Sequence, residues 1–184
     1  MKGGISAGTA ILWKPFLQVK PRYLKGLEHR ATLVSVRVHS IGELWIACLY
    51  GDAHSNQAAK DQLLKLWSQI KDKEFWVILG DFNLEADEVR EWMTIAAPGA
   101  MTLDVGPTRF AGGGAKPSTL DFGVFSKSAR FLVQGAEACL ATLPTHRPVD
   151  FYILDSGLEA EVWTKPKIQR SVCSGRGCAP ERTA

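Results

Sequence analysis

The chain has 184 residues, of which 46% are hydrophobic and 22% charged, close to the average for a single globular domain. This composition excludes a disordered or collagen-like protein, and the longest strongly apolar run, Phe75 to Leu79, is far too short to span a membrane. The net charge is only +3, but Met1 to Arg37 carries seven basic residues and one acidic residue. A phosphate-rich partner could use that segment, although composition alone favours an ordinary solvated surface.

Short apolar stretches alternate with Gly and Pro breaks and with helical patterns, which is typical of an α/β protein. Length and composition predict six strands, which in chain order are Ile5 to Trp13, Ala31 to His39, Leu44 to Tyr50, Phe75 to Leu79, Thr119 to Ser126 and Val149 to Leu154. In the second strand, alternation places Val34, Val36 and Val38 on one face.

Two amphipathic helices are predicted between these strands. The first covers Ala58 to Lys71, with an apolar stripe made of Leu63, Leu64, Trp67 and Ile70. The second covers Glu85 to Ile95 behind an acidic first turn, with an apolar group made of Val89, Trp92 and Met93. Two helices are too few to cover the outer faces of two sheets.

The cysteines and the N-terminal residues indicate the cellular compartment of the protein. Four cysteines are too few and too scattered for a disulfide scaffold, and no apolar targeting region follows Met1. We therefore expect an intracellular protein, nuclear or cytoplasmic.

Residues 164–184 carry five basic side chains, one acidic side chain and few apolar ones. We expect one domain over residues 1–163, followed by a basic, disordered tail over 164–184.

The residues that could carry chemistry begin where an apolar strand runs into Gly80. Asp81 and Asn83 follow it two residues apart, a spacing that sends both side chains to one side at the carboxyl end of the strand. The carboxylate can hold a water or a cation, and the amide can bind a phosphate oxygen without adding negative charge. An Asx turn that caps the following helix explains the pattern equally well, so the spacing alone leaves both interpretations open.

Gly-Asp-Phe-Asn after an apolar strand resembles the signature of the endonuclease/exonuclease/phosphatase family, whose members have the deoxyribonuclease-I-like fold. Four further segments resemble the family's motifs in the family's order: the Gly-rich strand Ala7 to Trp13, the Tyr-ending strand Leu44 to Gly51, Pro107-Thr108-Arg109-Phe110 with the Asp-bearing strand Thr119 to Ser126, and the closing Thr145-His146-Arg147-Pro148-Val149. The resemblance covers roughly Gly3 to Leu154. It implies an incomplete four-layer α/β/β/α sandwich of two mixed β-sheets.

The resemblance also implies a metal-dependent phosphodiester hydrolase, of which a nuclease-type domain that cuts a nucleic-acid strand is the first expectation. Retroelement endonucleases of the family share the Tyr-Gly and Gly-Asp-Phe-Asn style seen here. His146 matches the catalytic histidine, and Asp121 matches the carboxylate that hydrogen-bonds it. Asp81 would orient or deprotonate the attacking water, Asn83 and Tyr50 would hold the phosphate, and Mg²⁺ or Mn²⁺ would offset the developing negative charge. Seen alone, a Tyr at a strand end is usually a packing residue, and a His before Arg-Pro is usually a loop residue.

Two departures from the family pattern concern the metal. The family's first strands carry an Asn and then a metal-binding Glu, whereas this chain begins at the Gly-rich strand that follows them, so we expect an N-terminally truncated domain without its main metal ligand. Thr145 stands where the family has an Asp, and a hydroxyl binds a hard cation more weakly than a carboxylate does. We therefore expect impaired activity. The alternatives are an inactive remnant that binds nucleic acid or protein, and a phosphatase acting on a small phosphoester.

Overall fold

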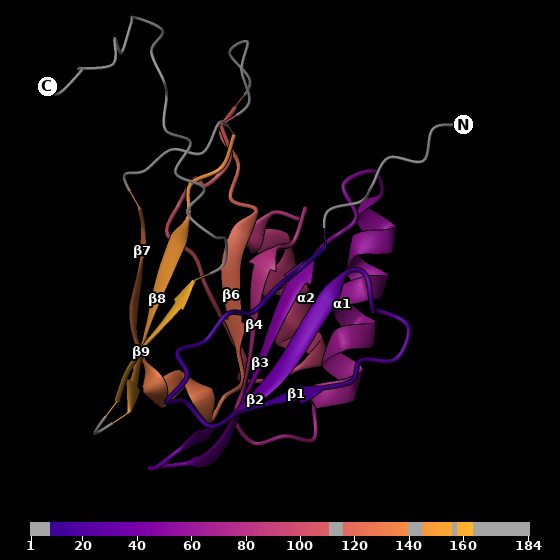
Figure 1. Cartoon of the computed structure of the whole chain (residues 1–184). Coiled ribbons are helices and arrows are strands. Elements are labelled where there is room, and N and C mark those ends of the chain that lie inside the picture. Colours follow the sequence, from indigo (N-terminus) through magenta and orange to yellow (C-terminus); the bar gives the residue numbers. More distant parts are fainter. Residues whose placement is uncertain (1–7, 111–115, 140–144, 156–157, 164–184) are drawn as a thin grey trace, which may run out of the picture.

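A computed structural model describes residues 8–110, 116–139, 145–155 and 158–163, which form two sheets and two α-helices (Figure 1). The six-stranded sheet has the order β1-β2-β3-β4-β6-β5, and the three-stranded sheet has the order β7-β8-β9. The elements in chain order are β1 (Val19–Arg22), β2 (Ala31–Val38), β3 (Gly42–Tyr50), α1 (Asn56–Ile70), β4 (Trp76–Asp81), α2 (Ala86–Ala96), β5 (Met101–Leu103), β6 (Asp121–Phe125), a 3₁₀ helix (Ala129–Leu132), β7 (Val133–Ala138), β8 (Val149–Asp155) and β9 (Leu158–Trp163).

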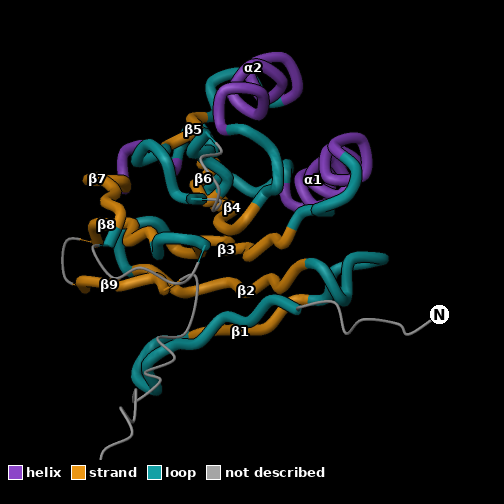
Figure 2. The backbone as a smooth tube through the Cα atoms, turned by 90° about the horizontal axis from the view of Figure 1, so that it is seen from above, coloured by secondary structure: helices purple, strands orange, loops and turns teal. Residues whose placement is uncertain are grey.

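The elements are stacked in three layers, as Figures 1 and 2 show. Helices α1 and α2 cover one face of the six-stranded sheet, and the small sheet packs against the other face. Within the described part of the chain no α-helix covers the outer face of the small sheet, and no helix is long and apolar enough to cross a membrane. The expected incomplete sandwich is therefore confirmed, while the proposed tail at 164–184 lies outside the described residues.

The central strands supply side chains to two separate cores. On β2, Leu33 packs into the core beneath the helices, while Val34 packs into the core between the sheets with Val36 and Val38 beside it. This confirms the predicted valine face. The core between the sheets also contains Phe125 of β6 and Phe151 of β8, whose ring centroids lie 6.0 Å apart. Because both faces of the large sheet are covered, its central strands are nearly continuous apolar runs.

Both predicted helices are present, with one correction to the buried stripe. Helix α1 begins after Ser55, whose hydroxyl accepts a hydrogen bond from the backbone N–H of Ala58 at 3.2 Å. Leu64 was expected in its buried stripe but is 43% exposed, and Leu66 is buried in its place. The buried positions of α1 are Ala59, Leu63, Leu66 and Ile70, which follow the helical spacing of three and four residues, whereas Leu64 is turned by about 100° from Leu63.

The prediction of a strand over Ile5 to Trp13 is wrong for its described residues, which form no strand. The edge of β2 is instead paired by β1, the short strand Val19–Arg22. The earlier segment contacts β2 at Thr32, whose Oγ1 is 2.8 Å from Thr9 Oγ1 and donates to the Thr9 carbonyl oxygen at 3.1 Å. Strand β1 was not predicted from the sequence because it contains Pro21. Proline argues against a central strand but is tolerated on an edge strand.

Two glycines let the ends of β3 and β4 approach closely at the edge of the sheet where the polar residues lie. Gly80 has φ +149°, and a Cβ built there would lie 1.9 Å from the carbonyl oxygen of Leu49. A Cβ on Gly51 would lie equally close to the carbonyl oxygen of Phe82. Neither contact is compatible with a side chain, so packing requires a glycine at both positions, including the one directly before Asp81.

Gly80→Ala should lower the free energy of unfolding by at least about 2 kcal/mol, because it combines a disfavoured φ with a backbone clash. Urea denaturation followed by circular dichroism measures the change. Gly42→Ala is the matched control, since Gly42 has φ +84° but open space around its Cα. Equal destabilisation by the two substitutions would show that the clash with the Leu49 carbonyl does not contribute to the change in the free energy of unfolding.

Candidate active site

Three of the predicted site residues form a row across the carboxyl end of β4. Tyr50 of β3 pairs with Asp81 of β4, and Asp81 pairs with Asp121 of β6. Paired residues on neighbouring strands share a face of the sheet. Alternation along β4 puts Leu79 and Asp81 on the face that meets the small sheet, so the row lies at the rim of the space between the two sheets.

The aromatic residues next to the two aspartates fix which way the carboxylates point. Phe82 and Phe122 are buried on the helix side of the sheet, and their rings stack with centroids 4.1 Å apart and planes 11° apart. Each phenylalanine follows an aspartate directly, so both carboxylates must point to the opposite face. The apolar alternation of the motif therefore orients Asp81 and Asp121 as a pair.

Thr108 connects the strand that carries Asp121 to the segment before it. Its side chain is fully buried, and its Oγ1 accepts hydrogen bonds from the backbone N–H groups of Leu120 at 3.2 Å and Asp121 at 3.0 Å. Its own backbone N–H donates to the carbonyl of Ser118. A buried hydroxyl with these partners holds the start of β6 rigidly. Sequence reasoning listed Thr108 within a motif without recognising this role.

The same segment also holds the histidine loop. The backbone N–H of Arg147 donates to the carbonyl of Thr108 at 2.7 Å, and the N–H of Phe110 donates to the carbonyl of Thr145 at 2.9 Å. These bonds flank His146 on both sides and present its ring to the row of carboxylates. The residues just before β8 are thereby tied to the large sheet, although β8 itself belongs to the small one.

The resulting cluster consists of Asp81, Asp121 and His146. His146 Nδ1 lies 2.7 Å from Asp121 Oδ2, and His146 Nε2 lies 3.9 Å from Asp81 Oδ2. The side chains are 16%, 10% and 6% exposed for the histidine, Asp121 and Asp81 respectively. One ligand atom from each residue lies within 4.8 Å of the other two. Two carboxylates and an imidazole at this spacing could together hold a metal ion.

Asp81 also makes the Asx turn that was the alternative interpretation of the motif. Its Oδ1 accepts from the backbone N–H of Asn83 at 3.1 Å, and Asn83 has φ +50°. The turn does not cap α2, whose N-cap residue is Glu85. The Asp81 carboxylate is therefore compatible with both interpretations, because Oδ1 forms the turn while Oδ2 lies 3.9 Å from His146 Nε2.

The remaining predicted residues flank the cluster. The side-chain amide of Asn83 donates to the carbonyl of Gly51 at 3.0 Å, so this N–H is directed to the backbone of the β3 loop and away from the carboxylates. Tyr50 lies in the row beside Asp81 and is partly exposed. Thr145, the residue at the expected position of a family Asp, is exposed and takes part through its backbone carbonyl.

A charged pair that sequence reasoning missed lies next to Tyr50. The Arg30 guanidinium carbon is 5.6 Å from the centre of the Tyr50 ring, and Arg30 Nη2 is 3.4 Å from Asp52 Oδ2. Hydrogen bonds from the backbone N–H groups of His54 and Ser55, together with the charge of Arg30, lower the pKa of Asp52 against the effect of its desolvation. Asp52 directly follows Tyr50-Gly51, and an acidic residue just after a strand end is the sequence feature that could have indicated its place near the site.

Comparison with solved structures identifies the fold. The endonuclease domain of TRAS1, a telomere-specific non-LTR retrotransposon, is similar with a TM-score of 0.61 and 17% identity, over 77% of this chain and 71% of that one. The cytolethal distending toxins of Actinobacillus actinomycetemcomitans (TM-score 0.51, 14% identity) and Haemophilus ducreyi (TM-score 0.50, 15% identity) are similar over 72% of this chain. This chain spans 57% of each toxin chain.

These similarities confirm the expected deoxyribonuclease-I-like fold, which the solved structures of the endonuclease/exonuclease/phosphatase family share. The sequence matches no family model and no curated protein.

Proposed function

We propose that this chain hydrolyses phosphodiester bonds in nucleic acid with the help of Mg²⁺ or Mn²⁺. The observation that carries the proposal is the geometry of His146, which approaches Asp121 through Nδ1 and Asp81 through Nε2. The deoxyribonuclease-I-like fold supports it, because the endonuclease domain of TRAS1 is similar in structure.

Asp121 prepares His146 for contact with a phosphate. At 2.7 Å the carboxylate can accept the Nδ1–H of the imidazole, which fixes the tautomer. Nε2 then remains the atom that can bind or protonate a phosphate oxygen. This division of the two ring nitrogens is the arrangement that a general acid requires.

Asp81 stands at the correct distance to share a small group with His146. The 3.9 Å between Asp81 Oδ2 and His146 Nε2 exceeds a direct hydrogen bond, so a water or a substrate oxygen can contact both atoms. The Asx turn keeps the carboxylate in place through its other oxygen. Asp81 therefore orients, or takes the proton from, the attacking water.

Asn83 and Tyr50 complete the phosphate site at the two strand ends beside the cluster. The bond from Asn83 to Gly51 fixes the plane of the amide, and Tyr50 presents a phenol next to Asp81. Both are neutral groups, so they can hydrogen-bond phosphate oxygens without adding negative charge. The carboxylates of Asp81 and Asp121 would hold the divalent cation, and such an ion offsets the charge that develops on the phosphate.

Nicking of supercoiled plasmid by the 184-residue chain tests the proposal. We expect impaired but metal-dependent cleavage, slow with Mg²⁺ or Mn²⁺ because Thr145 stands where the family has an Asp. With a chelator we expect none, because carboxylates that cannot be neutralised repel the phosphate. Calorimetric titration with Mn²⁺, repeated on Asp81→Asn, measures the metal site without depending on turnover. Cleavage that ignores the chelator would contradict the mechanism. Hydrolysis of small phosphoesters without nicking would assign the site to the alternative substrate class.

A further inference from the structure

Thr108 is bonded to both chain segments that meet at the catalytic cluster. Its side-chain Oγ1 accepts from the backbone N–H groups of Leu120 and Asp121, which begin β6. Its backbone carbonyl accepts the N–H of Arg147, the residue after His146, at 2.7 Å. One residue therefore connects the strand that carries the aspartate to the loop that carries the histidine.

The hydroxyl of Thr108 takes the place of a neighbouring strand at the start of β6. Strand β5 pairs with β6 no further than Gly123. Asp81 and Asp121 are a non-hydrogen-bonded pair, because the backbone bond beside them joins the residues that flank the pair. The N–H of Asp121 consequently points away from β4, and it donates to Thr108 at 3.0 Å.

The backbone of His146 is fixed from the same segment. The histidine forms an isolated antiparallel bridge with Arg109, the residue after Thr108. The bond from the Arg147 N–H to the Thr108 carbonyl closes this bridge on one side. The positions of His146 and Asp121 are therefore both set by the segment that begins with Thr108.

Burial makes the side-chain bonds of Thr108 hard to replace. The residue is 0% exposed, and its two hydroxyl lone pairs are matched by the two N–H groups. Valine has nearly the same shape but no acceptor, so Thr108→Val would leave both N–H groups buried without a partner. The start of β6 would have to shift to regain one, and the 2.7 Å contact between Asp121 and His146 would shift with it.

We propose that Thr108 is the positioning residue of the candidate site and that its hydroxyl holds Asp121 at hydrogen-bond distance from His146. With the carboxylate held at Nδ1, Nε2 is left to face the phosphate. Thr108 itself acts only through the two residues that it places. The proposal rests on the proposed function for the effect on cleavage, and on the geometry alone for the effect on the histidine ring.

Cleavage kinetics are the first readout. We expect Thr108→Val to lower kcat for metal-dependent nicking by about 10- to 100-fold, because a misplacement of reacting groups by about 1 Å has an effect of this order. KM should stay nearly unchanged, since the groups that contact the substrate are all retained. Thr108→Ser keeps the hydroxyl and should restore most of kcat.

The histidine ring gives a second readout that does not depend on turnover. Proton–nitrogen NMR correlation spectra, recorded in chelator at mildly alkaline pH, report which ring nitrogen carries the proton, and His146→Ala assigns the signals. We expect the proton on Nδ1 in the wild type and in Thr108→Ser. In Thr108→Val we expect it to be shared between Nδ1 and Nε2, because the carboxylate no longer selects one tautomer.

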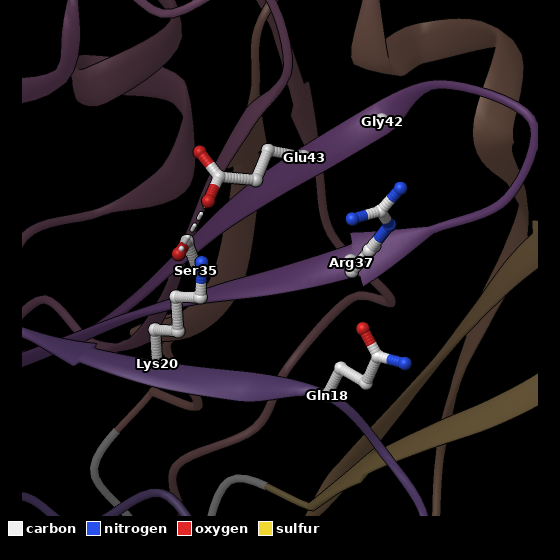
Figure 3. Close-up of a pocket in the computed structure, with 6 residues that line it drawn as sticks. All are labelled: Gln18, Lys20, Ser35, Arg37, Gly42 and Glu43. Carbon is white, nitrogen blue, oxygen red and sulfur yellow. Dashed lines mark hydrogen bonds between the residues drawn. The ribbon is translucent and has the colours of Figure 1, made fainter.

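Two hydroxyls elsewhere in the large sheet provide matched controls. Thr102 Oγ1 is buried and, within the described part of the chain, has no hydrogen-bond partner, so Thr102→Val makes the same exchange without breaking a bond. The buried Ser35 hydroxyl donates to Glu43 at 3.1 Å, as Figure 3 shows, and Ser35 pairs with Trp45, five residues before Tyr50 on β3. Ser35→Ala therefore breaks a buried bond away from the site. We expect both controls to keep kcat and the wild-type ring spectrum, although Ser35→Ala should lower the Tm.

Three outcomes would overturn the role of Thr108. One is an equal loss of kcat in Thr108→Val and Ser35→Ala, which would show a general effect of broken buried bonds. Another is a Thr108→Ser variant as slow as Thr108→Val, because the hydroxyl would then not be the group that matters. The third is an unchanged ring spectrum in Thr108→Val. If Thr108→Val does not fold, Thr108→Cys takes its place with the same expectations, since a thiol is a weak acceptor.

The two readouts separate this proposal from the proposed function. Metal-dependent cleavage at equal kcat by the wild type and Thr108→Val would refute the role of Thr108 and leave the proposed function standing. A wild-type chain that never cleaves, but whose ring spectrum changes in Thr108→Val and not in the controls, would refute the proposed function and leave the role of Thr108 standing.

Discussion

His146→Ala is expected to lower the rate of metal-dependent cleavage by about 10²- to 10⁴-fold, the usual contribution of a general acid or base. The substitution removes the Nε2 atom that lies nearest to Asp81 and leaves the Asp121 carboxylate without its 2.7 Å partner. Single-turnover nicking of supercoiled plasmid in Mn²⁺ measures the effect. His29→Ala is the matched control, because His29 is exposed and lies in the turn before β2.

Thermal unfolding of both histidine variants separates chemistry from folding. His146 is only 16% exposed, so some loss of stability is expected, but the folded protein should persist at the assay temperature. Cleavage by His146→Ala at the wild-type rate would remove the histidine from the mechanism.

Asp81→Asn is expected to lower the rate by at least about 100-fold and to weaken Mn²⁺ binding, because it removes the negative charge beside His146. The substitution preserves the side-chain oxygen that accepts from the Asn83 N–H, and asparagine forms Asx turns as readily as aspartate. The variant therefore keeps the turn and loses only the charge. Nicking rates and calorimetric Mn²⁺ titration give the two readouts.

The control for charge alone is Asp72→Asn, since Asp72 is exposed in the turn after α1. Full activity of Asp81→Asn would mean that Asp81 serves only as a turn residue. In that case the Asx interpretation of the motif would be sufficient, and the carboxylate would have no catalytic task.

Local patterns predicted the elements that bury long apolar faces. Strands β2, β3, β4, β6 and β8 and both helices lie where periodicity and composition placed them, with ends shifted by a few residues at most. The strands that were missed are β1, β5, β7 and β9. Three of them carry weak local signals, since β1 contains Pro21, β5 has three residues, and β7 contains Gly135. Such strands form because a neighbouring edge is available for pairing, and a single sequence does not show that edge.

The candidate site was predictable as a set of residues but not as an arrangement. Asp81, Asp121 and His146 belong to motifs, and the structure brings them within 4.8 Å of one another. Their mutual placement depends on the buried hydroxyl of Thr108 and on backbone bonds between segments about 40 residues apart, such as Arg147 to Thr108. Non-local bonds of this kind leave no spacing pattern in the sequence.

The cluster takes its carboxylates from one sheet and its histidine from the residues that lead into the other. The spacing between Asp81 and His146 therefore depends on the apolar layer between the sheets, where Phe125 meets Phe151, in addition to the backbone bonds around Thr108. A slight loosening of that layer would separate the histidine from the aspartates long before either sheet melts. If the proposed function holds, warming should abolish cleavage at a temperature where the circular dichroism is still that of the folded chain, and core substitutions at Phe151 should lower the cleavage rate before they unfold the protein.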